Sequence, residues 1–184
     1  MAAARRAWAV DLLHVWFHEL GPRDWFAVKP AIDARLGRRF ARHWTALRSQ
    51  PADSFFDGPA TALAAVLLFD QVPRNIHRGT PLAFASDPLA RRIAREALRR
   101  GWDRPLSQRQ CQFLAMPLMH SEAIADQRAA LSYYARLGPR YGWPFARVHY
   151  RMIARFGRFP HRTAVLGRRS TAAENRAVAA GFAW

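Results

Sequence analysis

Apolar residues recur at the 3.6-residue spacing of an amphipathic helix along nearly the whole chain. The clearest stripe begins after Pro30 and follows steps of four and three, through Ile32, Leu36, Phe40, Trp44 and Leu47. No run of useful length alternates apolar and polar residues as a half-buried strand does. The pattern predicts an all-α fold.

Residues that start and stop helices divide this pattern into about eight segments. The predicted helices span residues 6–20, 30–47, 60–72, 88–100, 107–116, 121–137, 144–156 and 171–181. Pro73 and Pro117 are expected to end the third and fifth of them, because an internal proline removes a helix hydrogen bond. Asp87 is expected to cap the helix that follows it. Short connections favour antiparallel helix pairs in a single domain over residues 1–184.

The composition indicates how the core is stabilised and where in the cell the protein is expected. The chain is 51% hydrophobic and has seven Trp and twelve Phe, enough for a core that needs neither disulfides nor metals. Cys111 is the only cysteine and is expected to be a reduced, packed thiol. Asp11 and His14 interrupt the apolar N-terminal stretch, which argues against an export signal, and no later run is long enough for a membrane helix. A cytoplasmic location is the expectation.

The formal net charge of +16 raises the question of a nucleic-acid partner. Because Lys29 is the only lysine, the basic excess is almost all arginine, which a coding bias toward arginine and alanine would also produce. The chain has no aromatic-and-basic RNA motif and no zinc-finger spacing. We therefore expect nonspecific, salt-sensitive adhesion to polyanions rather than specific recognition.

Three segments concentrate polar residues among apolar neighbours. In the first, residues 67–75, Asp70 and Arg74 are spaced for an ion pair at the end of an apolar helix, with Gln71 and Asn75 beside them. One interpretation is a clamp at the helix end. The other makes Arg74 a fork for a carboxylate or phosphate, oriented by Asp70.

The second segment, residues 116–127, places His120 just before a predicted helix that carries Glu122 and Asp126. A carboxylate beside a histidine suits acid–base chemistry, although the spacing of His120 and Glu122 does not fit a metal site on a regular helix. The structural alternative is a helix start, with Ser121 as the cap and His120 bonded to backbone. None of the seven histidines shows a tight ligand spacing, so no metal and no cofactor is predicted.

The third segment, residues 149–171, is the densest in cationic and titratable groups. Arg155, Arg158, His161 and Arg162 lie on a short connection in which Gly157 is suited to a sharp turn. They are arranged to converge on an anion or to pair with the acids of the other two segments. Since buried carboxylates need compensation, we predict that the three segments meet in space around Arg74, His120, Glu122, Arg155, Arg158 and His161.

These segments also carry a family resemblance. The motifs Leu68-Phe69-Asp70-Gln71-Val72-Pro73-Arg74-Asn75, Met116-Pro117-Leu118-Met119-His120-Ser121-Glu122 and Arg155-Phe156-Gly157-Arg158-Phe159-Pro160-His161-Arg162 resemble those of the bacterial family called domain of unknown function 924. The resemblance implies a tetratricopeptide-like superhelix of α-helices and supplies no catalytic residue. The chain departs from the family's pattern at Lys29-Pro30, Thr163 and Ala173.

The leading functional hypothesis is a helical module that binds a small anionic ligand or an acidic peptide in an arginine- and histidine-rich groove. The first alternative is a hydrolase-type enzyme that uses His120 or His161 as general acid or base, with Glu122 or Asp126 orienting it. The second is a structural or polyanion-associated protein without a discrete site. No nucleophile elbow or glycine-rich phosphate loop selects the enzyme.

Overall fold

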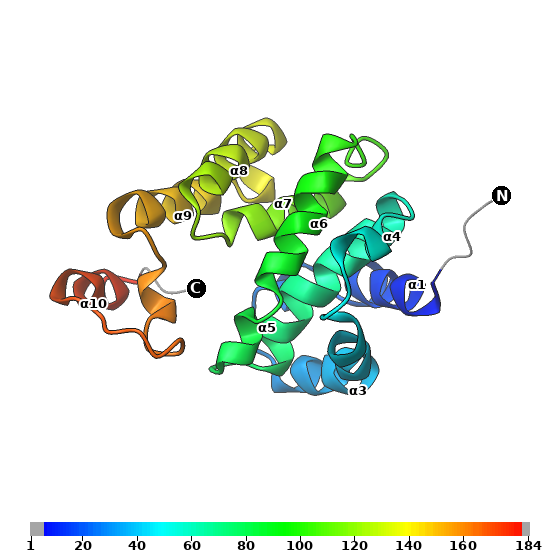
Figure 1. Ribbon diagram of the computed structural model, residues 1–184, viewed down its shortest axis with the longest axis horizontal. Helices are drawn as coiled ribbons and strands as arrows, with labels where there is room; N and C mark the ends of the chain where they lie inside the picture. Colours follow the sequence, from blue (N-terminus) through cyan, green and yellow to red (C-terminus); the bar gives the residue numbers. More distant parts are fainter. Residues whose placement is uncertain (1–5, 182–184) are drawn as a thin grey trace.

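The computed structural model describes residues 6–181 and confirms the predicted all-α fold: no strand occurs in this range (Figure 1). The helices of eight residues or more are α1 (Ala7–His14), α3 (Pro30–Leu47), α4 (Pro59–Val66), α6 (Asp87–Arg99), α7 (Gln108–Met119), α8 (Ile124–Leu137), α9 (Trp143–Phe156) and α10 (Ala172–Ala179). Two short helices, α2 (Pro22–Trp25) and α5 (Val72–Ile76), lie between them. That residues 1–184 form one domain stays a prediction.

Two of the predicted helix ends are wrong, both at prolines. The third helix does not stop at Pro73, because a wider π-helical turn (η3, Leu67–Gln71) leads directly into α5. Pro73 lies in the first turn of α5, where its missing N–H is tolerated. Pro117 lies inside α7, which continues to Met119. A second π-helical turn (η1, Val15–Glu19) extends α1 to the end predicted for the first helix.

The structure confirms two of the predicted helix caps and contradicts a third. The predicted capping boxes form at Ser107 with Gln110 and at Thr171 with Glu174. The predicted cap Asp87 is wrong: Ser86 is the residue before α6, and the Asp87 carboxylate is bonded elsewhere. This frees Asp87 for a long-range ion pair, described below.

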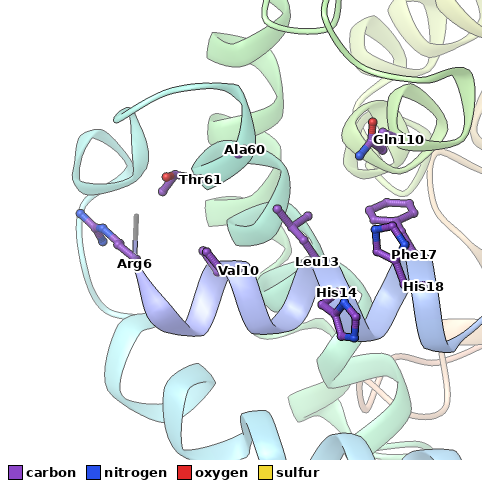
Figure 2. A pocket seen from close by; sticks show the side chains of 10 residues that line it. Arg6, Val10, Leu13, His14, Phe17, His18, Ala60, Thr61 and Gln110 are labelled. Carbon is purple, nitrogen blue, oxygen red and sulfur yellow. The ribbon is translucent and has the colours of Figure 1, made fainter. Parts of the chain in front are cut away.

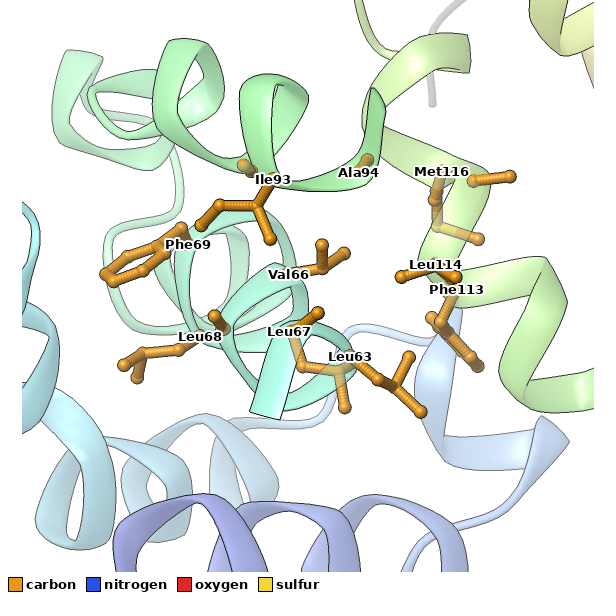
Figure 3. Packing of buried hydrophobic residues seen from close by; sticks show 14 of the residues in the cluster. Leu63, Val66, Leu67, Leu68, Phe69, Ile93, Ala94, Phe113, Leu114 and Met116 are labelled. Carbon is orange, nitrogen blue, oxygen red and sulfur yellow. The ribbon is translucent and has the colours of Figure 1, made fainter. Parts of the chain in front are cut away.

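The core is built around α4 and η3. Their residues Leu63, Val66, Leu67, Leu68 and Phe69 are all fully buried, between side chains of α6 and α7 (Figure 3). This confirms that the third helix is central, as its apolar character on all sides predicted. A second, smaller cluster of Met152, Ile153 and Phe159 supports α9 and the segment after it.

Helices α9 and α10 lie at the end of the molecule opposite α1 (Figure 1). Gly157 adopts the left-handed conformation, with φ of 70°, and ends α9 with a sharp turn. The chain then passes through a 3₁₀ turn (η6, Pro160–Arg162) before reaching α10. Across residues 6–181, no helix combines the length and the apolar character that crossing a membrane requires.

Candidate functional site

The first two polar motifs meet at Asp70, whose side chain is 0% exposed. Its carboxylate lies 2.8 Å from His120 Nδ1 and 3.3 Å from Arg74 Nη1, and it also accepts a hydrogen bond from Gln71 Nε2. The Asp70–Arg74 pair is the one that the four-residue spacing predicted. The contact with His120 joins η3 to the end of α7, 50 residues away.

Burial and neighbouring charges set the protonation states of Asp70 and His120. Burial alone would raise the pKa of Asp70, but Arg74 and His120 outweigh it and hold that pKa below its ordinary range. Burial lowers the pKa of His120 despite the attraction of Asp70. At neutral pH a neutral imidazole therefore donates its Nδ1–H to an ionised carboxylate.

Asp87 and Arg162 extend the contact into a buried ionic network, which we define as Asp70, Arg74, Asp87, His120 and Arg162. Arg74 donates two hydrogen bonds to the Asp87 carboxylate, at 2.8 and 2.9 Å. Arg162, which is 5% exposed, donates from Nη1 to the His120 carbonyl oxygen at 3.0 Å and lies 3.6 Å from Asp87. Burial, aided by Arg74, lowers the pKa of Arg162 to about 10, so it stays protonated at neutral pH.

Aromatic rings complete the environment of Arg162. Its guanidinium lies 4.8 Å from the centre of the Phe84 ring and 4.4 Å from that of Phe159. All three polar motifs thus contribute to one network, which contains two arginines and two aspartates. Its charges are balanced internally, and it is better suited to holding helices together than to receiving an anion.

Glu122 lies beside the network and binds the third motif. Its carboxylate accepts from the Phe159 backbone N–H at 2.8 Å and from both terminal nitrogens of Arg168 at 2.7 and 2.9 Å. Although burial raises the pKa of Glu122, Arg168 and the Phe159 N–H reverse the effect and lower it. Glu122 is therefore a connector between α7 and the segment after α9, and it does not bond His120.

Asp126 is fully buried and forms a separate cluster. It accepts from Arg95 Nε at 2.7 Å, from Ser121 Oγ at 2.7 Å and from Arg91 at 3.2 Å. The carboxylate that faces His120 is thus Asp70, not Glu122 or Asp126. Asn75 also has a structural contact, from its side-chain N–H to the Gln71 carbonyl oxygen at 3.0 Å.

The remaining candidates of the third motif separate. Arg158 pairs with Glu174 of α10, at 2.6 and 3.0 Å, and donates to the Arg169 carbonyl oxygen. His161 packs against Phe159, with ring centres 5.7 Å apart, and its pKa is lowered by burial first and then by the charges of Arg162, His120 and Arg74. Arg155 is exposed on α9, away from these contacts. The structure therefore brings Arg74, His120, Glu122 and His161 together, places Arg158 at the border, and leaves Arg155 outside.

Two surface pockets lie away from the buried ionic network. One, of about 340 Å³, runs along α1 and is bordered by Ala60 and Thr61 of α4 and by Gln110 of α7 (Figure 2). Its wall is largely apolar, with Val10, Leu13 and Phe17, and its arginine, Arg6, is paired with Asp57 at 3.0 Å. This pocket therefore has no spare arginine charge for an anion.

The second pocket, of about 370 Å³, lies between α9 and α10, and we call it the α9–α10 groove. Three arginines line it, and no ion pair joins any of them to an acidic residue within residues 6–181. Its complete lining is Val148, Arg151, Met152, Arg155, Ala173, Arg176, Ala177 and Ala180. Sequence reasoning selected Arg155 and missed Arg151 and Arg176, because the groove exists only once α10 lies beside α9.

Buried histidines make the stability of the protein sensitive to acid. Burial, with help from Arg162, lowers the pKa of His161 to about 4, and burial also lowers that of His149 to about 2. In the unfolded chain both titrate near 6.5, so below that pH the unfolded state binds more protons than the folded state. The free energy of unfolding should fall as the pH drops from about 6.5 to 4, by at most about 1.4 kcal/mol per pH unit for each histidine.

Urea denaturation at several pH values measures this slope. His161→Gln should flatten it between pH 6.5 and 4, since the proton that His161 binds on unfolding is then absent, while the other buried histidines still contribute. An unchanged slope in the variant would show that His161 is not the group responsible.

The structure defines an all-α protein whose polar motifs meet in a buried ionic network. Three arginines that have no acidic partner within residues 6–181 line a groove at one end. The family described as bacterial protein of unknown function, DUF924, matches residues 12–181, and the chain belongs to that family. A solved structure, that of a protein of unknown function, ATU0120, from Agrobacterium tumefaciens, is 38% identical, with a TM-score of 0.87. The similarity covers 92% of this chain and 96% of that one. No curated protein matches the chain.

Proposed function

We propose that the protein is a helical module that binds an anionic ligand in the α9–α10 groove. The observation that carries the proposal is the set of three arginines, Arg151, Arg155 and Arg176, which face one groove without an acidic partner in the described chain. Arginine presents a planar fork that suits carboxylate and phosphate groups. The volume of about 370 Å³ lies within the range of small-ligand sites.

The proposed site is the α9–α10 groove and not the place where the three polar motifs meet, which the sequence suggested as the site. The buried ionic network uses its own aspartates to satisfy Arg74 and Arg162, so an incoming anion would compete with existing ion pairs. In the α9–α10 groove an anion would break no ion pair formed within residues 6–181. The family resemblance implies a tetratricopeptide-like superhelix as the scaffold of this site, and the single cysteine and the interrupted N-terminal stretch favour a cytoplasmic setting.

Anion titration followed by thermal unfolding tests the proposal. A ligand that binds only the folded state stabilises it by about 2.7 kcal/mol at a concentration of 100 times its Kd. We expect phosphate or a polycarboxylate to raise the melting temperature of the native chain at constant ionic strength. The double variant Arg155→Gln/Arg176→Gln should lose this shift.

Arg38→Gln/Arg92→Gln is the matched control, because it also removes two charges from exposed helix positions, on α3 and α6, that form no ion pair in the described chain. The control should keep the full thermal shift. Equal shifts in both variants would mean that anions act through the overall positive charge and would reject the groove as the site.

The second candidate is a hydrolase-type enzyme, and the Asp70–His120 contact is the observation that favours it. A buried carboxylate that holds Nδ1 of a histidine leaves Nε2 to accept a proton, as in a catalytic triad. The His120 side chain is 12% exposed and lines neither pocket, so access for a substrate is narrow. Ester hydrolysis that disappears in His120→Gln, with the fold intact, would favour this candidate over the binding module.

A further inference from the structure

The charge that lines the α9–α10 groove continues beyond it along α9. Arg147, Arg151 and Arg155 follow one another at intervals of four residues, and all three are exposed. Four residues of an α-helix rise about 6 Å, so the three positions form a regular row on one face. Like charges at this spacing repel one another. No ion pair from residues 6–181 relieves that repulsion.

The floor beside this row is apolar and runs along both helices. Val148 and Met152 contribute from α9, Ala173 and Ala177 contribute from α10, and Ala180 follows directly after α10. The lining covers residues 148–155 and 173–180, about two turns of each helix. The alanines of α10 leave room for another helix to approach, since the distance between packed helices depends on side-chain size.

Resting on the proposed function, we infer that the ligand is an amphipathic helix of an acidic partner protein. Its carboxylates would repeat every four residues, and its small apolar residues would lie on the floor of the groove. Two α-helices rise equally per residue, so carboxylates at positions i, i+4 and i+8 match the row of Arg155, Arg151 and Arg147. A small anion inside the groove would leave Arg147 unused, since Arg147 is not part of the lining.

Single-stranded nucleic acid is the competing polyanion, and the lining of the groove disfavours it. Proteins that bind single strands combine basic grooves with aromatic side chains on which the bases stack. The lining of the α9–α10 groove contains no aromatic side chain; its floor consists of valine, methionine and alanines. An acidic helix needs only the arginine row and the apolar floor.

Two peptides of identical composition test the inference. Both contain three glutamates, alanines and leucines; in the first the glutamates fall at every fourth position, and in the second they are permuted to every second position. Fluorescence anisotropy with the full chain should show about tenfold or greater preference for the first peptide, weakening with salt. The variant Arg151→Glu/Arg155→Glu should reject it and bind the corresponding lysine peptide instead.

The double variant Arg38→Glu/Arg92→Glu reverses two exposed charges elsewhere, controls for net charge and should keep the preference for the glutamate peptide. Equal binding of the two isomers, or tighter binding of a single-stranded RNA of similar charge, would overturn the inference. If inorganic phosphate still gives a thermal shift that Arg155→Gln/Arg176→Gln removes, the proposed function survives that failure. If neither peptide nor phosphate binds, both proposals fail.

Discussion

Replacing Asp70 with alanine should lower the free energy of unfolding by about 3–5 kcal/mol, the cost of breaking a buried ion pair by removing one partner. The carboxylate of Asp70 is fully buried and interacts with His120, Arg74 and Gln71. Without it the Gln71 amide loses an acceptor, and Arg74 retains the Asp87 carboxylate and the backbone carbonyl oxygen of residue 70. The methyl group of alanine also leaves a void beside the core of α4 and α7.

Urea denaturation of the native chain and the variant measures this loss directly. Asp70→Asn should cost less, because the amide oxygen can still accept one hydrogen bond. Asp53→Ala is the matched control, since Asp53 is exposed on the 3₁₀ turn η2 (Ala52–Phe55), and it should change stability by no more than about 0.5 kcal/mol. A loss of similar size in the control and in Asp70→Ala would mean that the network does not stabilise the fold.

Contacts between residues three or four positions apart could be predicted from the sequence. The Asp70–Arg74 pair follows from a four-residue interval on one helix face, and the capping boxes at Ser107 and Thr171 follow from a three-residue interval. The convergence of the three motifs followed from the cost of burying carboxylates without cations. The same reasoning did not identify which carboxylate faces His120, because that depends on how η3 packs against α7.

Asp87 shows why the long-range ion pairs of the site could not be predicted from the sequence. An aspartate before a proline at the start of a helix reads as a cap, and nothing local indicates that its carboxylate reaches Arg74 instead. The pairing of Arg168 with Glu122, 46 residues away in the sequence, could not be predicted for the same reason. Long-range ion pairs are set by the packing of elements, whereas periodicity reports only the face on which a residue lies.

The α9–α10 groove was the least predictable feature, since it depends on the placement of two helices. Arg151 and Arg155 could be assigned to one face of α9 by their spacing, but Arg176 lies on α10, after a connection of irregular structure. The pair between Arg158 and Glu174 joins the segment after α9 to the first turn of α10. We expect this pair to be the main contact that holds the α10 wall of the proposed site in place.

Replacing Arg158 with alanine should release α10 from the rest of the molecule. Arg158 donates to both carboxylate oxygens of Glu174, at 2.6 and 3.0 Å, and to the Arg169 carbonyl oxygen at 2.9 Å. The Glu174 side chain is 3% exposed, and hydrogen bonds from Arg158 and the Thr171 N–H lower its pKa to about 2. The buried apolar side chain of α10 is the small Ala177, so packing alone holds the helix weakly.

Hydrogen exchange and anion binding together measure the release. In Arg158→Ala the amides of residues 172–179 should lose their protection, while those of α4 and α7 keep theirs, because local unfolding leaves the main core intact. Binding of the glutamate peptide or of phosphate should weaken about tenfold or more, since Arg176 no longer faces Arg151 and Arg155. Arg158→Lys should show a smaller change, because lysine keeps the positive charge beside Glu174 and loses only the planar contact with both carboxylate oxygens.

Arg169→Ala is the control for removing a neighbouring charge, since the Arg169 side chain is exposed and only its backbone carbonyl is used. This variant should keep both the protection of α10 and the affinity for the anion. Full protection of residues 172–179 in Arg158→Ala would show that other contacts position α10. The groove requires Arg176 and the alanines of α10 to face α9. Loss of protection with unchanged anion affinity would therefore show that binding does not need α10, and it would reject the groove as the site.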